Sequence, residues 1–92
     1  MKIKKCVLDG RDIGSAESLY DELARQLAFP TYFGRNMDAL WDVLTMDLEG
    51  PIEIVWNDFP LSRAKMGDKF EKFISIFKNV EKERSDFKLI LK

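Results

Sequence analysis

Histidine is absent from this 92-residue chain, and cysteine occurs once, as Cys6. The lack of histidine removes the commonest general base, the usual zinc ligand and the usual pH switch of proteins. A single cysteine excludes an internal disulfide bond and a cysteine-rich metal site. We therefore expect no zinc centre, no bound cofactor and no catalysis that depends on a histidine.

Long apolar runs are also missing. No stretch approaches the ~20 apolar residues that a membrane-spanning helix requires. The amino-terminal MKIKKCVLDG has basic residues but neither the apolar region of about 7–15 residues nor the cleavage site of a secretory signal. We expect a cytoplasmic protein that does not contact membranes, folded as one small domain over residues 1–92.

The charge is nearly balanced over the chain but is concentrated in one segment. Fifteen lysines and arginines stand against sixteen aspartates and glutamates, for a net charge of −1. This balance disfavours direct nucleic-acid binding, which usually requires a clearly basic surface. From Pro30 to Glu53 five carboxylates face one base, Arg35, so this stretch carries −4. We call residues 30–53 the acidic segment and take it as the main candidate for a functional surface.

Hydrophobic spacing and turn residues predict the element order β–α–α–β–α–α–β. The expected strands are Ile3–Leu8, Ile52–Trp56 and Phe87–Leu91. The expected helices run from a Ser15 cap to Pro30, from Met37 to about Thr45, over a short piece capped by Asn57 or Asp58, and onward from Gly67-Asp68. Strands separated by helices imply crossover connections, so we predict an α/β fold with a three-stranded parallel sheet and about four helices packed on it.

The loop before the second helix has several features of a surface site. Pro30 is expected to end the preceding helix, and Gly34 is the residue expected to take a positive φ. Asn36 is a favourable N-cap for the next helix. Tyr32 and Phe33 lie between these signals and are expected at the surface, since loops run over the outside of proteins.

Two aspartates, Asp38 and Asp42, lie one turn apart on the helix predicted after Asn36. Like charges at this spacing destabilise a helix by a few tenths of a kcal/mol. The helix dipole partly offsets this for Asp38, but Asp42 has no basic residue three or four positions away. The pair is either a solvated acidic face or a surface complementary to a basic partner. The aromatic residues nearby favour the partner, because aromatic side chains beside charges that can be desolvated are typical of interface hot spots. Tyr32 in its loop fits this better than Trp41, which lies on the Leu40/Leu44 side of the helix and fits a core position.

Other chemistry is poorly supported by the residues. Oxygen ligands suit magnesium or calcium, but the acidic segment lacks the D-x-D-x-D-G spacing of a calcium loop. Cys6 lies in a predicted strand, with no histidine to activate its thiol. The lysines of the last helix face away from its aromatic residues, which leaves no stacking platform for nucleic acid.

The segment FPTYFGRNMDALWDVL resembles the loop and second helix of the barstar family, intracellular inhibitors of the secreted microbial ribonuclease barnase. The VLDG turn, the leucine-rich helix before the proline, the GPIEIVW strand and the final strand follow the order of that family. The resemblance covers essentially the whole chain. It implies a barstar-like sheet and helices, with the second helix and its preceding loop blocking the active site of a ribonuclease.

The resemblance also implies roles for individual residues. Asp42 would be the central anchor, with its carboxylate in the place of a substrate phosphate among the basic catalytic residues of the enzyme. Asp38 would add a second charge, and the Tyr32 ring would pack on a catalytic side chain. The remaining implied contacts are Gly34, Asn36, Trp41, Thr45 and Glu49. The chain would then be a non-enzymatic inhibitor or immunity protein, as in a toxin–antitoxin pair, monomeric when free and directed at a basic microbial ribonuclease or nuclease toxin.

Two residues depart from the family pattern, and two other functions stay open. Arg35 and Asn79 stand where the family's inhibitor has acids, and the resemblance implies a cis peptide bond at Gly50–Pro51. One alternative is a protein-interaction module whose acidic helix docks a basic cytoplasmic protein other than a nuclease. The other is a small metal-dependent hydrolase that uses Asp38 and Asp42.

Overall fold

Three parallel strands form one sheet in the order β1-β2-β3, which confirms the predicted α/β architecture. The structure is a computed structural model that describes residues 2–92. The strands are β1 (Lys4–Asp9), β2 (Ile52–Asn57) and β3 (Phe87–Leu91). The helices are α1 (Ala16–Leu27), α2 (Met37–Asp42), the π-helix η1 (Val43–Asp47), α3 (Phe59–Met66) and α4 (Asp68–Glu83).

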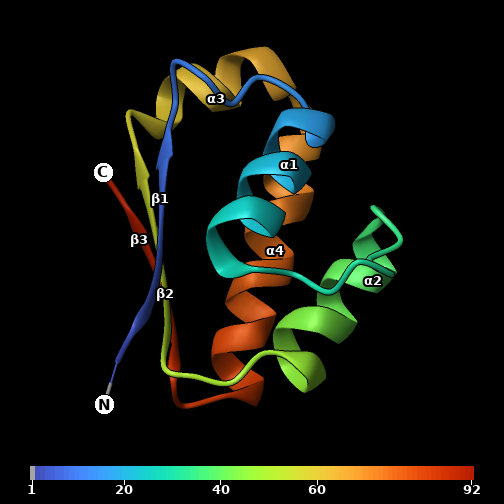
Figure 1. Cartoon of the computed structure of the whole chain (residues 1–92). Helices are drawn as coiled ribbons and strands as arrows, with labels where there is room; N and C mark the ends of the chain where they lie inside the picture. The colour runs from blue at the N-terminus through green and yellow to red at the C-terminus, as the bar shows by residue number, and fades with distance from the viewer. Residues whose placement is uncertain (1) are drawn as a thin grey trace.

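Helices α1, α2 and α4 lie on one side of the sheet (Figure 1). Successive strand residues point to opposite faces, so every second residue faces these helices. In register, the helix-facing rows include Cys6, Ile54 and Leu89, then Leu8, Trp56 and Leu91. The other face carries a charged row of Lys5, Glu53 and Lys88 and an apolar row of Val7, Val55 and Ile90.

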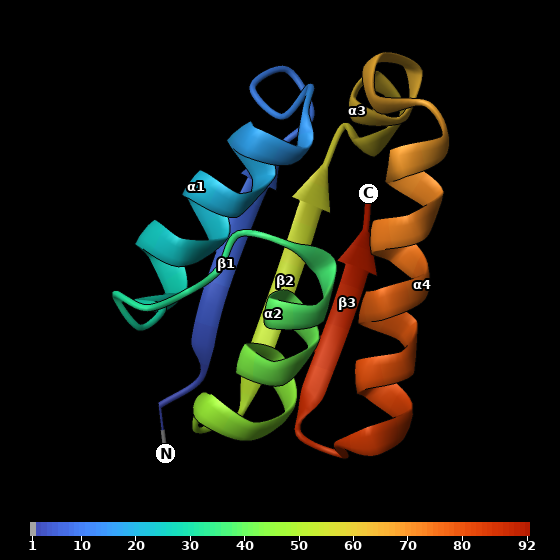
Figure 2. The same ribbon diagram turned by 90° about the vertical axis from the view of Figure 1, so that its right-hand side faces the viewer.

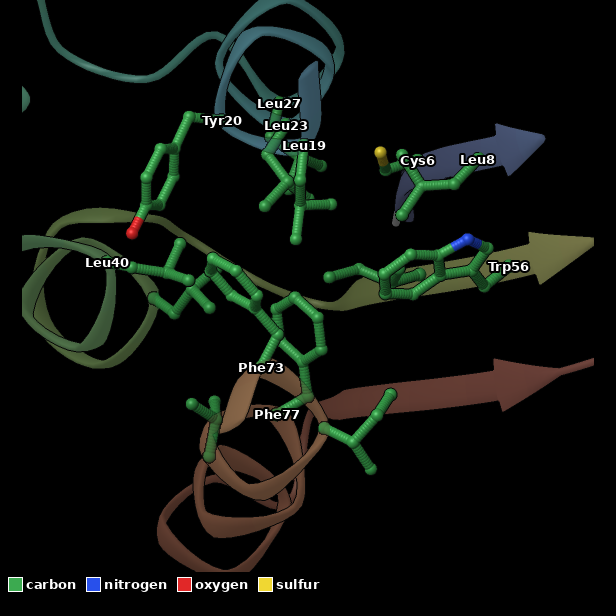
Figure 3. Packing of buried hydrophobic residues seen from close by; sticks show 14 of the residues in the cluster. Cys6, Leu8, Leu19, Tyr20, Leu23, Leu27, Leu40, Trp56, Phe73 and Phe77 are labelled. Atoms are coloured by element: carbon green, nitrogen blue, oxygen red, sulfur yellow. The ribbon is translucent and has the colours of Figure 1, made fainter. Parts of the chain in front are cut away.

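The core lies between the sheet and the helices. The spacing of apolar residues in α4 predicts a buried stripe, and the structure confirms it for Phe70, Phe73, Ile74, Phe77 and Val80. Helix α2 lies outermost, in front of the sheet between α1 and α4 (Figure 2). Its Leu40 is fully buried and points toward Tyr20 of α1 and Phe73 of α4 (Figure 3). None of the helices within residues 2–92 is long and apolar enough to cross a membrane.

Several boundaries differ from the predicted ones. Helix α1 ends at Leu27 because Ala28 takes the left-handed conformation with φ 53°, before Pro30 is reached. The second helix changes to a π-helix from Val43 onward, which hydrophobic spacing cannot signal. Asp58 occupies the N-cap position of α3, but its side chain makes no capping hydrogen bond. The Gly50–Pro51 peptide bond, by contrast, is cis as the resemblance implies.

Both outer strands have a backbone group satisfied by a helix side chain. The Gln26 amide of α1 accepts from the Val7 N–H at 2.8 Å and donates to the Val7 carbonyl at 2.9 Å. Glu81 of α4 accepts from the Leu89 N–H at 2.9 Å. An unpaired strand edge is a template for pairing with other chains, and these contacts occupy the middle of each edge.

Candidate functional site

Aromatic packing holds the loop from Pro30 to Asn36 against α1. The Phe33 ring packs edge-on to Phe29 at 4.9 Å and to Tyr20 at 5.6 Å between centroids. Phe33 is therefore partly buried, and the expectation that it lies at the surface is wrong. Its neighbour Tyr32 is 73% exposed, which confirms that expectation for Tyr32. The loop thus buries one aromatic side chain and presents the next one to solvent.

Arg35, rather than Gly34, takes the positive φ in this loop, at 52°. Its guanidinium turns back to α1, where Nη2 lies 2.7 Å from Glu17 Oε2 and Nη1 lies 2.8 Å from Asp21 Oδ1. The Arg35 Cζ also lies 5.9 Å from the centre of the Tyr20 ring. The prediction for Gly34 weighed backbone preference alone, and two ionic partners can hold a larger residue in a sparsely populated conformation.

Asn36 caps α2 as predicted, because its Oδ1 accepts a 2.7 Å hydrogen bond from the Ala39 N–H. Asp38 and Asp42 follow on the exposed side of this helix, and within residues 2–92 neither forms a salt bridge. Glu53, which belongs to the same acidic segment, lies apart on β2, 3.8 Å from Lys5. Of the carboxylates of the acidic segment, those without a salt bridge within residues 2–92 therefore lie on α2, on η1 and at Glu49 just after η1.

The π-helix η1 joins the helix face to the loop. Thr45 is partly buried and donates a 2.7 Å hydrogen bond to the Trp41 carbonyl, while the Trp41 ring packs partly buried against the core. Tyr32 donates to Asp47 Oδ2 at 3.3 Å, which connects the loop to the end of η1. Partial desolvation, with a further contribution from the Asp47 carboxylate, raises the pKa of Tyr32. The phenol therefore stays neutral at physiological pH.

The predicted contact residues from Gly34 to Glu49 thus occupy one continuous loop–helix stretch, and Tyr32 is joined to it through Asp47. The sequence interpretation missed Met46, which is 69% exposed and lies four residues after Asp42. That i, i+4 spacing is the signal that could have found it. Asn79 is exposed on α4, outside this stretch.

A second missed residue is Arg84, whose side chain closes the carboxyl end of η1. Its Nη1 donates to the Leu44 carbonyl at 2.7 Å and to the Leu48 carbonyl at 2.8 Å. The same guanidinium binds both oxygens of Asp86 through Nε and Nη2 at 2.8 and 2.9 Å. Nothing local in the sequence signals these contacts, because the carbonyls lie 36 and 40 residues before Arg84.

The geometry offers little for metal binding or covalent chemistry. Among residues 2–92, no group of three or more histidine, cysteine, aspartate or glutamate side chains could hold a metal ion. Burial raises the pKa of Cys6 to about 12, and the fully buried thiol stays protonated at neutral pH. A pocket of about 400 Å³ lies at the start of β2 and β3, and its lining includes none of the predicted site residues.

Comparison with known proteins supplies the family. The family model described as barstar (barnase inhibitor) matches residues 3–92. The chain belongs to the barstar family. A relative from Bacillus subtilis (strain 168), named "Putative ribonuclease inhibitor YrdF", is 37% identical to this chain over 90 residues. That alignment covers 97% of this chain and 99% of the relative.

Family membership confirms the resemblance first seen in the segment FPTYFGRNMDALWDVL. The match extends over all three strands and all the helices of the described chain. Within this barstar-family fold, the exposed aspartates of α2 lie between two supported segments. The loop before α2 is packed against α1 through Phe33, and the end of η1 is bound by Arg84. The candidate site is therefore an exposed surface on which Asp38 and Asp42 have no salt-bridge partner within residues 2–92.

Proposed function

We propose that this chain is a ribonuclease inhibitor that binds the active site of a basic microbial ribonuclease through the acidic segment. Membership of the barstar family and the name of the 37% identical relative support an inhibitor in place of an enzyme. The structural observation that carries the proposal is the pair Asp38 and Asp42. Both are exposed on α2 and both lack a salt-bridge partner within residues 2–92.

The proposed mechanism is competitive and involves no bond making. The Asp42 carboxylate takes the place of a substrate phosphate among the basic catalytic groups of the enzyme, and Asp38 adds a second charge. The exposed Tyr32 ring covers a catalytic side chain. Gly34, Asn36, Trp41, Thr45 and Glu49 complete the contact. Opposite charge on the two partners accelerates capture and suppresses binding to acidic proteins.

In this proposal the chain acts in the cytoplasm, as a monomeric domain spanning residues 1–92, and protects the RNA of its own cell. An ordered surface favours tight binding because less conformational entropy is lost on association. The aromatic packing of Phe33, the Asn36 cap and the Tyr32–Asp47 hydrogen bond all supply such order before a partner arrives.

The experiment is a titration of a guanyl-specific microbial ribonuclease with the purified chain, read as cleavage of RNA. We expect cleavage to stop at equimolar inhibitor. Asp42→Ala should weaken binding by about 2–5 kcal/mol, since it leaves the basic groups of the enzyme buried without a partner. Asp12→Ala is the matched control, because Asp12 is an exposed aspartate in the turn after β1.

Two results would contradict the proposal. Unchanged cleavage in the presence of excess wild-type chain would exclude this enzyme class, and a search for another basic partner with the acidic segment as bait would follow. Equal losses from Asp42→Ala and Asp12→Ala would mean that binding responds to net charge and has no anchor at Asp42.

A further inference from the structure

We propose that Arg84 is a positioning residue for the candidate binding surface. Its guanidinium holds the carboxyl end of η1 and so fixes the stretch from Val43 to Glu49 in the form that a partner meets. The consequence for binding rests on the proposed function, whereas the effect on η1 is a property of the free protein. We call Arg84, Asp86 and the two carbonyl groups that Arg84 binds the Arg84 clamp.

The end of η1 lacks a cap of its own. Helix ends leave their last carbonyl groups without partners within the helix. Leu48, at the C-cap position, is extended with φ −94° and ψ 131°, and the last turn of η1 contains no basic residue. A π-helical turn is rare and short, and such turns often occur at functional sites. The carbonyl groups of this turn therefore depend on donors from elsewhere in the chain.

Arg84 supplies those donors from the end of α4. One nitrogen, Nη1, reaches the carbonyl oxygens of both Leu44 and Leu48, at 2.7 and 2.8 Å. The Arg84 side chain is only 14% exposed, so water competes weakly for these bonds. A positive charge at this position also complements the partial negative charge at the carboxyl end of a helix. The contacts join η1 to the α4–β3 connection.

Asp86 orients the guanidinium group of Arg84. It receives the Nε and Nη2 bonds in a two-pronged arrangement, which leaves Nη1 directed at the carbonyl groups. An arginine has five donors in a rigid planar fork, and this geometry matches the arrangement here. A lysine keeps the charge but has a single ammonium group, which cannot bind Asp86 in a fork and both carbonyl groups in the same way.

Gly50 provides the space for the clamp. A Cβ atom added at Gly50 would lie 2.7 Å from Arg84 Nη2 and even closer to the Asp86 carboxylate. A side chain at this position would therefore force the pair to move. Glycine at position 50 therefore leaves room for the Arg84 clamp in the geometry described here, and a larger residue would require the ends of Arg84 and Asp86 to shift.

The chain contains a matched pair without the carbonyl contacts. Arg11 binds Asp9 through Nε and Nη2 at 3.1 and 2.7 Å, with the same two-residue spacing as Arg84 and Asp86. The Arg11 side chain is 73% exposed, and its guanidinium donates to both carboxylate oxygens of Asp9. Loss of the Arg11 guanidinium therefore reproduces the loss of the ion pair without the loss of a helix cap.

The test is amide hydrogen exchange on the full free chain, comparing wild type with Arg84→Met, Arg84→Lys and Arg11→Met. The most informative amide is Leu48, whose N–H bonds to the Val43 carbonyl at 3.1 Å. We expect Arg84→Met to accelerate exchange at Leu48 and its η1 neighbours by roughly tenfold or more, as expected for losing charge-assisted hydrogen bonds. The exchange rates of Arg84→Lys in η1 should lie between those of wild type and Arg84→Met. Arg11→Met should leave the exchange rates in η1 unchanged.

Each outcome decides the proposal. Equal acceleration across α1, β2 and η1 would make Arg84 a general contributor to stability and overturn it, and so would unchanged exchange at Leu48. A second arm measures dissociation of the complex with a guanyl-specific ribonuclease, which Arg84→Met should accelerate although Arg84 need not touch the enzyme. Unchanged dissociation would overturn the positioning role. If wild type does not bind that enzyme, the proposed function fails. The exchange result alone then decides whether Arg84 holds the end of η1 in the free protein.

Discussion

Arg35 Nη2 lies 2.7 Å from Glu17 Oε2, in an ion pair that joins the acidic segment to α1. The arginine also pairs with Asp21, so its charge is directed to α1 and away from α2. From the sequence, Arg35 made the acidic segment look less negative than the family pattern. In the structure, Asp38 and Asp42 nevertheless remain without a basic partner within the described residues.

Arg35→Gln should speed association with a basic ribonuclease. The change removes a positive charge near the proposed contact and frees Glu17 and Asp21, so the field that steers the partner becomes stronger. We expect the association rate constant to rise roughly two- to fivefold at low ionic strength and the gain to vanish at high salt. Stopped-flow mixing over a salt series measures this. Arg11→Gln makes the same change in net charge elsewhere, and an equal gain there would contradict a local effect.

Met46→Ala should weaken the same complex. The Met46 side chain is 69% exposed one turn after Asp42, and a flexible thioether adapts well to an uneven apolar surface. We expect a loss of about 1 kcal/mol of binding free energy, a typical size for a contact beside a hot spot. Isothermal titration calorimetry provides the measurement. Leu61→Ala, at a residue that is 46% exposed on α3, should change nothing, and a similar loss there would exclude a specific Met46 contact.

Gly50→Ala should destabilise the free protein by about 1 kcal/mol, the lower end of the range for overpacking, because the crowded groups are side-chain ends that can partly move aside. The added methyl group would press on Arg84 and Asp86. Gly34→Ala is the matched control, since its Cβ would meet its nearest neighbours at 3.4 and 3.5 Å, an ordinary contact distance. Urea unfolding followed by Trp fluorescence measures both. Equal stability of Gly50→Ala and wild type would refute the close fit around the clamp.

The stability of the free protein should depend on pH through Asp86. Hydrogen bonds from Arg84, with a smaller contribution from its charge, lower the pKa of Asp86 below its usual value of 3.8. A lowered folded-state pKa gives stability that is present above 3.8 and is lost as the pH falls through the folded-state pKa. The advantage of wild type over Asp86→Asn should therefore stay constant down to about pH 5 and then shrink as the pH falls through 3.8 toward the folded-state pKa. A difference that does not change with pH in urea unfolding would contradict this.

The main elements of the fold could be predicted because their signals are local. The apolar stripe of α4, the Asn36 cap and the alternation of strand residues each depend on neighbours within a few positions. The parallel sheet follows from their order along the chain. The boundaries that were wrong depend on competition between neighbours, as when Ala28 ends α1 before Pro30 can.

The charged residues of the candidate site could be predicted from the sequence, but the distant contacts that hold them in place could not. Asp38 and Asp42 stand out from their spacing alone, and Tyr32 from its place in a loop. By contrast, the conformation of Arg35 depends on acids 14 and 18 residues earlier, and the clamp by Arg84 depends on carbonyl groups 36 and 40 residues earlier. Such contacts exist only once the chain has folded, so no pattern of neighbouring residues reports them.

Gln26 of α1 and Glu81 of α4, which bond to the backbone of the two outer strands, limit how this protein can bind others. Many peptides attach to proteins by lengthening a sheet with one more strand. Here the middle of each edge is already occupied, at Val7 by the Gln26 amide and at Leu89 by the Glu81 carboxylate. Lengthening of the sheet is therefore obstructed on both sides. For the same reason, newly made copies crowded in a cell have less chance of joining edge to edge.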